Sequence, residues 1–496
     1  MSLPPAARPD DDPVVAVCDT GASAYPDREP FDPPEAYPEL PSPDGALKAT
    51  NSVYAGVRET LRLLGLDAGR YGGASWNPLG EIIRPGDRVV IKPNLVRHFH
   101  GNGGRLDALV THGSVVRAVL DYALLALGNR GEVTLGDSPL QYADFASTLR
   151  ACGLVGVIER TRRHAAVPIR VVDFRRERSE KRDGMIVARV PNDGDPGGYK
   201  IVDLQSSSRF AGLPADRMRR FRVTQYDPRT MQRAHGESTH AYLLPASVLG
   251  ADVVINLPKL KTHRKVAITA AMKNLVGING SKDWLPHHTA GCVASGGDEY
   301  LQRSLRKAVI SALRDRLEGR RNPLARRAIR IVERAVKATG HVTAFPDPYW
   351  EGSWHGNDTL WRMVHDLHRA LFFADSSGAL RAEPQRRCLT IVDAVVAGEG
   401  EGPMRPAPRP TGLLVAGANP LAVDTVCCRL MGFDERRIPL LFNAINNGFH
   451  PPLAAPERIR IATNAPAWER LFDLPRSQTL RFAPPAGWAG VVELKA

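Results

Sequence analysis

The sequence contains few cysteines, and none of them stands in a metal-binding arrangement. Only six occur in 496 residues, and no two form a CxxC pair or part of a ferredoxin-like run. Those spacings are the local signatures of zinc knuckles and iron–sulfur clusters. The sequence therefore predicts reduced, buried thiols and no iron–sulfur cluster.

Long apolar runs are also missing. No stretch approaches the roughly 18 residues that a membrane-spanning helix needs. Acidic residues occupy the N-terminal stretch, where a signal peptide would carry basic and apolar regions. We therefore expect a cytoplasmic protein without a transmembrane segment.

Several common catalytic motifs are absent as well. The chain has no Walker loop, no GxGxxG, no GxSxG and no HExxH, which removes the enzyme classes built on those motifs. The composition is otherwise ordinary for a globular protein, with 43% hydrophobic and 24% charged residues.

Alternating strand-like and helix-like segments predict an α/β fold. A β-branched strand at 88–92, a helix at 114–127 with Ser114 as its N-cap, and a strand at 132–135 form a βαβ unit, which implies parallel strands. Further strands are expected at 252–256, 388–393 and 413–416, followed by a helix that Asn419 and Pro420 open and Gly432 closes. The sequence thus predicts a largely parallel, helix-flanked sheet.

Composition shifts divide the chain into four segments. We predict an N-terminal arm at 1–45, a first part of the α/β core at 46–299, a mainly helical basic insertion at 300–385, and a second part of the core at 386–496. Asp358 and Arg362 belong to a patch of the insertion with more polar and charged side chains than a structural helix needs, which predicts a lid over the site. The alternative is that their neighbouring tryptophans only anchor the insertion to the core.

The formal charge is +13, and much of the excess lies in one segment. Between residues 303 and 337 the sequence has twelve Lys and Arg against three acidic residues, a net charge of +9. Apolar residues such as Leu305, Val309 and Leu313 recur at helical spacing, which predicts amphipathic helices with a basic outer face. That face is either simply solvated or contacts an anionic partner, a membrane surface or a nucleic acid.

Polar side chains follow each proposed strand, where ligands bind in open α/β sheets. In the extended stretch after 252–256, Lys259, Lys261 and His263 should share one face and form an anion-binding site with histidine acid/base chemistry. The predicted catalytic residues are His263, Lys273 and His112. The predicted substrate-binding residues are Lys92, Asn94, Asn256, Lys259, Lys261, Asn274, Asp358 and Arg362.

Carboxylates near 393–401 suggest a metal site. Asp393 precedes Glu399 and Glu401, which lie in a glycine-rich stretch that reads as a flexible turn, and Asp137 ends another strand. Hard oxygen ligands favour Mg²⁺ or Mn²⁺, whereas histidine participation would favour nickel or iron. We predict a divalent ion held by carboxylates from Asp393, Glu399 or Glu401, with Asp137 as a further candidate ligand.

Eight separated motifs occur in the order typical of one family. They are Ile91–Leu95 (IKPNL), Thr111–Gly113 (THG), Gly136–Pro139 (GDSP), Asn256–His263 (NLPKLKTH), Met272–Gly277 (MKNLVG), Gly356–Thr359 (GNDT) with Trp361 and Arg362, Asp393 with Gly400–Pro403 (GEGP), and Asn419–Asp424 (NPLAVD). Over about residues 85–435 the chain resembles the prokaryotic family Domain of Unknown Function 362. Some members carry a C-terminal ferredoxin-like domain, whose cysteines this chain lacks.

A fainter likeness concerns His263, Lys273 and Gly277. Their arrangement is similar to a region of the nickel-pincer lactate racemases, in which the lysine tethers the cofactor and histidines act as bases and nickel ligand. The leading hypothesis is an enzyme with a cationic, metal-assisted pocket for a small carboxylate or phosphate. The alternatives are a racemase or epimerase of a hydroxy acid, and a nucleic-acid or membrane-surface binder that uses residues 303–337.

Overall fold

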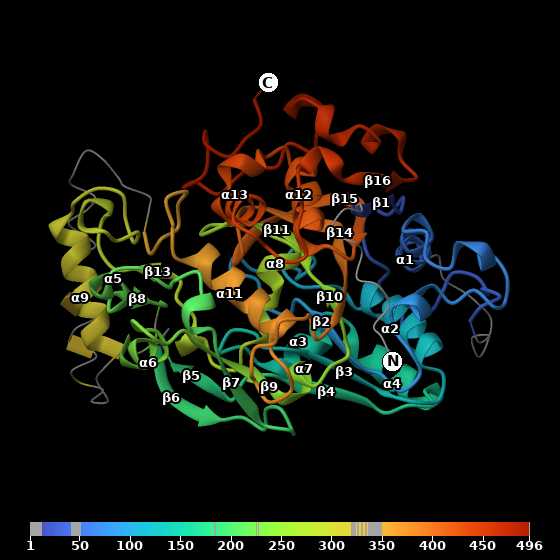
Figure 1. Cartoon of the computed structure of the whole chain (residues 1–496), viewed down its shortest axis with the longest axis horizontal. Helices are drawn as coiled ribbons and strands as arrows, with labels where there is room; N and C mark the ends of the chain where they lie inside the picture. Colours follow the sequence, from blue (N-terminus) through green and yellow to red (C-terminus); the bar gives the residue numbers. More distant parts are fainter. Residues whose placement is uncertain are drawn as a thin grey trace.

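One large sheet organises the molecule (Figure 1). The computed structural model describes residues 12–40, 51–182, 185–224, 226, 228–318 and 350–495, with a few positions between 324 and 335. The strand order is β16-β1-β15-β14-β10-β2-β3-β4. Five neighbouring strands are parallel: β14 (Arg387–Glu401), β10 (Val253–Leu257), β2 (Arg88–Pro93), β3 (Glu132–Asp137) and β4 (Ile169–Asp173). The predicted largely parallel α/β fold is confirmed.

The sheet continues through antiparallel pairs on its other side. β15 (Arg405–Gly417) runs antiparallel to both β14 and β1 (Val14–Asp19), and β1 pairs in parallel with β16 (Arg460–Thr463). The segment predicted as an N-terminal arm therefore contributes an internal strand to the sheet.

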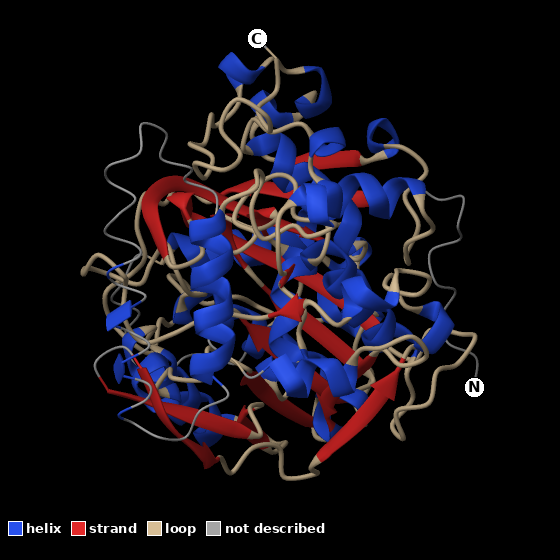
Figure 2. Cartoon of the chain, turned by 90° about the vertical axis from the view of Figure 1, so that its left-hand side faces the viewer, coloured by secondary structure: helices blue, strands red, loops and turns tan. Residues whose placement is uncertain are grey.

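Helices cover both faces of the sheet (Figure 2). Val89 and Ile91 of β2 pack into the cluster that includes α1 (Ser52–Leu63) and α2 (Gly113–Leu127), whereas Val90 packs into the opposite cluster. The second cluster contains residues of α11 (Leu360–Phe373), α12 (Pro420–Leu430) and α13 (Pro439–Asn446). Burial on both faces explains why the parallel strands are continuous β-branched runs.

Shorter elements surround this core. The described chain also contains α3 (Phe145–Ala151), α4 (Leu154–His164), β5 (Glu177–Arg182), β6 (Met185–Pro191), β7 (Tyr199–Asp203), α5 (Ala215–Met218), β8 (Phe221–Arg222), α6 (Pro228–Ala234), β9 (Ala241–Pro245), α7 (Ala246–Leu249), β11 (Lys259–His263), β12 (Ala267–Thr269), α8 (Ala271–Asn274), β13 (His288–Thr289) and α9 (Leu305–Glu318).

Two local predictions were wrong. Helix α2 starts at Gly113, and its N-cap is His112 rather than Ser114: the His112 ring accepts the Ser114 backbone N–H at 3.2 Å. The stretch at 398–402 is not a flexible turn, because β14 continues to Glu401 and pairs with β15, with Glu399 opposite Ala407.

Helix α9 departs from the prediction at Leu305, Val309 and Lys307. Leu305 is 84% exposed and Val309 is 38% exposed, whereas Lys307 is only 2% exposed. Lys307 lies over the rings of Tyr300 and Trp350, 5.5 Å from each centroid. Cation–π contacts thus hold Lys307 inward beside the buried Ile310 and leave Leu305 and Val309 outside. Most of the rest of the 303–337 segment lies outside the described residues.

Candidate functional site

The lysine-rich strand β11 forms beside β14, near the carboxyl ends of the parallel strands. It is extended and pairs in parallel with β14, with Lys259 opposite Asp393 and Lys261 opposite Gly398. All five of its residues are buried. The predicted one-face row of Lys259, Lys261 and His263 is therefore formed, but its three members have different surroundings.

Lys259 belongs to a buried cluster rather than to an open site. Its Nζ lies 2.6 Å from Asp393 Oδ2 and 2.5 Å from the Tyr25 hydroxyl, which itself donates to Asp393 Oδ1 at 2.5 Å. The side chains of Lys259 and Asp393 are both 0% exposed. Burial lowers the pKa of Lys259, and Asp393 opposes that shift. This lysine holds the N-terminal segment to β14.

A second buried network connects β2, β3 and α8. Lys92 Nζ lies 2.7 Å from Asp137 Oδ1 and donates to Asn274 Oδ1 at 3.2 Å. Asn94 bridges Asn274 to Lys261: its Nδ2 donates to Asn274 Oδ1 at 2.9 Å, and its Oδ1 accepts from Lys261 Nζ at 2.5 Å. The network therefore fixes the side chains that form the floor of a cavity.

Asn256 and Asp424 hold α8 against the sheet. Asn256 donates to the Ala271 carbonyl and accepts from Asn274 Nδ2 at 2.8 Å. The Asp424 carboxylate accepts the backbone N–H groups of Ala271 and Met272. Burial raises the pKa of Asp424 to about 7. Asp424, the last residue of its motif, thus has a role that its sequence context does not reveal.

The network opens into a cavity of about 310 Å³. Lysines, histidines and apolar side chains share its wall, and two residues of the predicted insertion, Glu351 and Ser353, reach it. Its polar lining includes Asn94, Asp137, Lys261, His263, Arg264, Lys265, Lys273, Asn274, Lys282 and His287. The structure thus brings Lys261, His263, Lys273, Asn94 and Asn274 together, as predicted.

The cavity carries more cationic than acidic side chains, and of its two acids, Asp137 and Glu351, the second pairs with Arg314. Lys273 and Lys282 form no ion pair within the described part of the chain, Lys261 donates only to the neutral oxygens of Asn94 and Leu109, and Asp137 is engaged by Lys92. Burial is the main cause that lowers the pKa of Lys273 to about 7 and that of Lys282 to about 8, with neighbouring lysines adding to the shift of Lys273. Uncompensated cations in a concave site attract an anion.

Two histidines of the cavity have opposite hydrogen-bonding capacity. His263 Nδ1 accepts the Lys265 backbone N–H at 3.1 Å, so the neutral ring carries its hydrogen on Nε2. His287 Nδ1 lies 2.7 Å from the Leu285 carbonyl and must donate to it, which leaves a lone pair on Nε2. Burial and nearby lysines hold both pKa values well below 6.5. His263 can therefore donate a hydrogen bond, and His287 can accept a proton.

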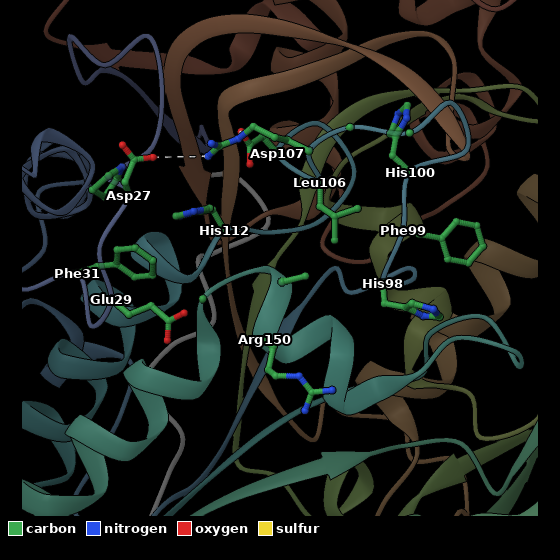
Figure 3. A pocket seen from close by; sticks show the side chains of 16 residues that line it. Asp27, Glu29, Phe31, His98, Phe99, His100, Leu106, Asp107, His112 and Arg150 are labelled. Carbon is green, nitrogen blue, oxygen red and sulfur yellow. Dashed lines mark hydrogen bonds and ion pairs between the residues drawn. The ribbon is translucent and has the colours of Figure 1, made fainter.

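A second cavity, of about 580 Å³, shares no lining residue with the first (Figure 3). His98, His100 and His112 line it, with Phe31 and Arg150. The His112 ring stacks on Tyr25 with 4.1 Å between centroids, and burial lowers its pKa to about 3. The predicted catalytic residue His112 is thus separated from His263 and Lys273.

The four carboxylates predicted to bind a metal do not form a site together. Asp137 is held by Lys92 and Asp393 by Lys259. Glu399 and Glu401 accept the backbone N–H groups of Ala483 and Ala486, at 3.0 and 2.8 Å. Within the described residues, no three His, Cys, Asp or Glu side chains are placed to hold a metal ion. The structure therefore does not bring three of the predicted ligands together, and a bound metal stays a prediction.

Asp358 and Arg362 were also placed wrongly in the predicted site. They pair with each other at 3.1 Å, and Asp358 also pairs with Arg217 at 2.8 Å. Neither lines the cavity. They connect the start of α11 to α5 through Arg217 and to the Arg209 carbonyl through Arg362. Glu351 and Ser353 are the insertion residues that line the cavity.

Gly277 provides a direct test of how closely the floor of the cavity is packed. A Cβ added there would lie 2.7 Å from Lys92 Nζ and would overlap the Asp137 carboxylate. We expect Gly277→Ala to lower the free energy of unfolding by about 1–3 kcal/mol through overpacking. Denaturant unfolding measures this, with Gly69→Ala as control because nothing lies within 4 Å of that Cβ. Equal stability of both variants would contradict the packing described here.

Comparison with known proteins agrees with the motif order. The family model described as "Domain of unknown function (DUF362)" matches residues 89–191 and 205–429. The chain belongs to this family. Both matched regions contribute to the cavity of about 310 Å³, the first through Asn94 and Asp137 and the second through Lys261, Lys273 and Lys282.

One curated relative of this DUF362 chain is the thylakoid-associated protein sll1697 of Synechocystis sp. (strain ATCC 27184 / PCC 6803 / Kazusa). It is 23% identical over 376 residues, which cover 76% of this chain and 73% of the relative. No solved structure matches the chain. Within the described residues no helix is both long and apolar enough to cross a bilayer.

Proposed function

We propose that this DUF362 protein is an enzyme that acts on a small carboxylate or phosphate in the 310 Å³ cavity. One observation carries the proposal: Lys261, Lys265, Lys273 and Lys282 line that cavity without forming an ion pair within the described chain. Charged groups in a buried site are normally paired. A substrate anion would supply the missing negative charge.

The two histidines supply proton chemistry. His287 would act as the general base through its free Nε2, and His263 would donate a hydrogen bond from Nε2 to an oxygen of the substrate. His287 thus takes the base role that the sequence analysis gave to His263. Apolar residues such as Val96, Val223 and Val276 line the same cavity and would contact the uncharged part of the substrate.

Anion binding tests this proposal without knowledge of the substrate. We expect sulfate and oxalate to bind with measurable heat in titration calorimetry, and glycerol of similar size not to bind. The double variant Lys273→Met/Lys282→Met should weaken sulfate binding by about tenfold or more, because each charged contact contributes about 1.5–3 kcal/mol. Lys200→Met, at an exposed position outside the cavity, is the matched control. Unchanged sulfate affinity in the double variant would refute the proposal.

The outward face of α9 favours a second function, contact with an anionic membrane surface. Leu305 and Val309 are exposed, and Arg303 and Arg316 are exposed beside them. Apolar side chains flanked by arginine are the elements of an interfacial helix, which combines burial in the lipid boundary with attraction to anionic headgroups. The thylakoid association that gives the Synechocystis relative its name supports this function.

Vesicle sedimentation tests the membrane contact. We expect the protein to bind phosphatidylglycerol vesicles more strongly than phosphatidylcholine vesicles, and Leu305→Glu/Val309→Glu to weaken binding by about tenfold or more through lost apolar burial. Ile201→Glu is the control, since Ile201 is exposed but lies in β7. The same test with duplex DNA over a salt series addresses the nucleic-acid alternative.

A further inference from the structure

Lys273 differs from the other lysines that the motifs bring together. Lys92 and Lys259 are each paired with a buried carboxylate, and Lys261 is held by two neutral oxygens. Lys273 lines the cavity, is only partly buried, and has no hydrogen-bond or ion-pair partner within the described residues. Of the four lysines in the motifs, Lys273 is therefore the one whose side-chain nitrogen is free to bind a ligand.

The backbone under Lys273 is rigid. Lys273 lies on α8, a single helical turn whose first two N–H groups are bound by Asp424 and whose Asn274 is bound by Lys92 and Asn256. Its side chain thus starts from a fixed point in the wall of the cavity. A reactive group on a rigid element can be positioned against a bound substrate.

The surroundings favour the neutral amine. Burial and the charges of Lys282, Lys92 and Lys265 bring the pKa of Lys273 to about 7. An ordinary lysine has a pKa of about 10.4, so only about one in a thousand is an amine at neutral pH. Desolvation beside other cations is one of the known ways to activate a lysine as a nucleophile.

We propose that Lys273 forms an imine with the carbonyl group of a small oxo acid. The inference rests on the proposed anion-binding function, since Lys265 and Lys282 would hold the carboxylate while Lys273 meets the adjacent carbonyl carbon. It also narrows the substrate class from any small anion to an anion that carries an aldehyde or ketone.

The proposed step balances without a further reagent. The Lys273 lone pair attacks the carbonyl carbon, a C–N bond forms, and the carbonyl π pair moves to oxygen. His287 Nε2 takes a proton from the new ammonium and returns it to that oxygen, giving a carbinolamine. The hydroxyl leaves as water after it accepts one more proton, which comes from solvent, and the nitrogen lone pair forms the C=N⁺ bond of the protonated imine.

Reductive trapping tests the imine. The full-length protein is incubated with glyoxylate and sodium cyanoborohydride, and adducts are located by peptide mass spectrometry. We expect labelling at Lys273 at least about tenfold faster than at the exposed Lys200, with a rate that rises with pH around 7 and falls when sulfate is added. Lys273→Arg should abolish the fast labelling, and Lys282→Arg should leave fast labelling on Lys273.

Other outcomes would overturn the imine proposal, and they show whether the anion-binding proposal fails with it. If sulfate binds in calorimetry but Lys273 is labelled no faster than Lys200, the imine proposal is wrong and the anion-binding function stands. Fast labelling at Lys265 or Lys282 instead of Lys273 also refutes it. If neither sulfate binding nor fast labelling is observed for protein with a native circular dichroism spectrum, both proposals fail.

Discussion

Replacing Asp393 by Asn is expected to lower the free energy of unfolding by about 3–5 kcal/mol, because it leaves the Lys259 ammonium buried without a counter-charge. The pair is fully buried at 2.6 Å, and the Asp393 carboxylate also accepts from the Tyr25 hydroxyl and the His112 backbone N–H. An amide at this place would turn donor hydrogens towards groups that already donate. Urea or guanidinium unfolding measures the loss.

The control separates buried charge from general sensitivity to substitution. Asp473 pairs with Arg470 at 2.8 Å, but both side chains are well exposed. Asp473→Asn should therefore cost no more than about 1 kcal/mol. The double variant Lys259→Met/Asp393→Leu removes both charges and should recover most of the stability lost in Asp393→Asn. A double variant as unstable as the single one would show that the charge pair is not the cause.

The parallel strands in the centre of the sheet could be predicted from the sequence because they are covered on both faces. β2 and β10 are buried on both faces, so they are short β-branched runs that stand out from their surroundings. The row on β11 was predictable from alternation alone, since an extended strand repeats every two residues. The Asn419–Pro420 start of α12 was also predicted, because capping is local chemistry.

Pairings between distant segments could not be predicted. Nothing in the sequence near Lys259 shows that Asp393 and Tyr25 will surround it, whereas Lys261, two residues later, lines the cavity of about 310 Å³. The orientation of α9 depends on Tyr300 and Trp350, whose rings hold Lys307 on the inner side of the helix. Helical periodicity alone would have placed Leu305 inside. The spacing of residues indicates which side chains share a face of a strand or helix. It does not indicate which distant segments pack against that face.

The sequence favours His263 over His287 as the proposed base for a related reason. His287 and His263 have the same ring, and only their backbone neighbours distinguish them. A carbonyl at His287 Nδ1 frees Nε2 as an acceptor, and an N–H at His263 Nδ1 makes Nε2 a donor. Hydrogen-bond partners of this kind depend on the folded loop at 285–287 and leave no pattern in the sequence.

Sulfate affinity is expected to fall at least about 50-fold between pH 7 and pH 9. The anion binds the protonated lysines, so binding raises the pKa values of these lysines. At a pH where a lysine is neutral in the unbound protein, that lysine must take up a proton when the anion binds. Lys273 has a pKa of about 7, so its deprotonation alone lowers the sulfate affinity by nearly tenfold for each pH unit above 7. Lys265 and Lys282 have pKa values of about 8 and add to the loss of affinity at higher pH.

Sulfate is the appropriate probe because its charge is constant over this range, so the pH dependence reports the protein. Lys273→Arg keeps a positive charge at every pH tested, and its curve should therefore lose the part of the decline that begins near pH 7 while keeping the part near pH 8. Calorimetry in buffers of different ionisation heat also gives the proton uptake directly. A sulfate affinity that is flat from pH 6 to pH 9 would mean that the lysines of the cavity keep ordinary pKa values, and the neutral amine that the imine requires would then be rare at physiological pH.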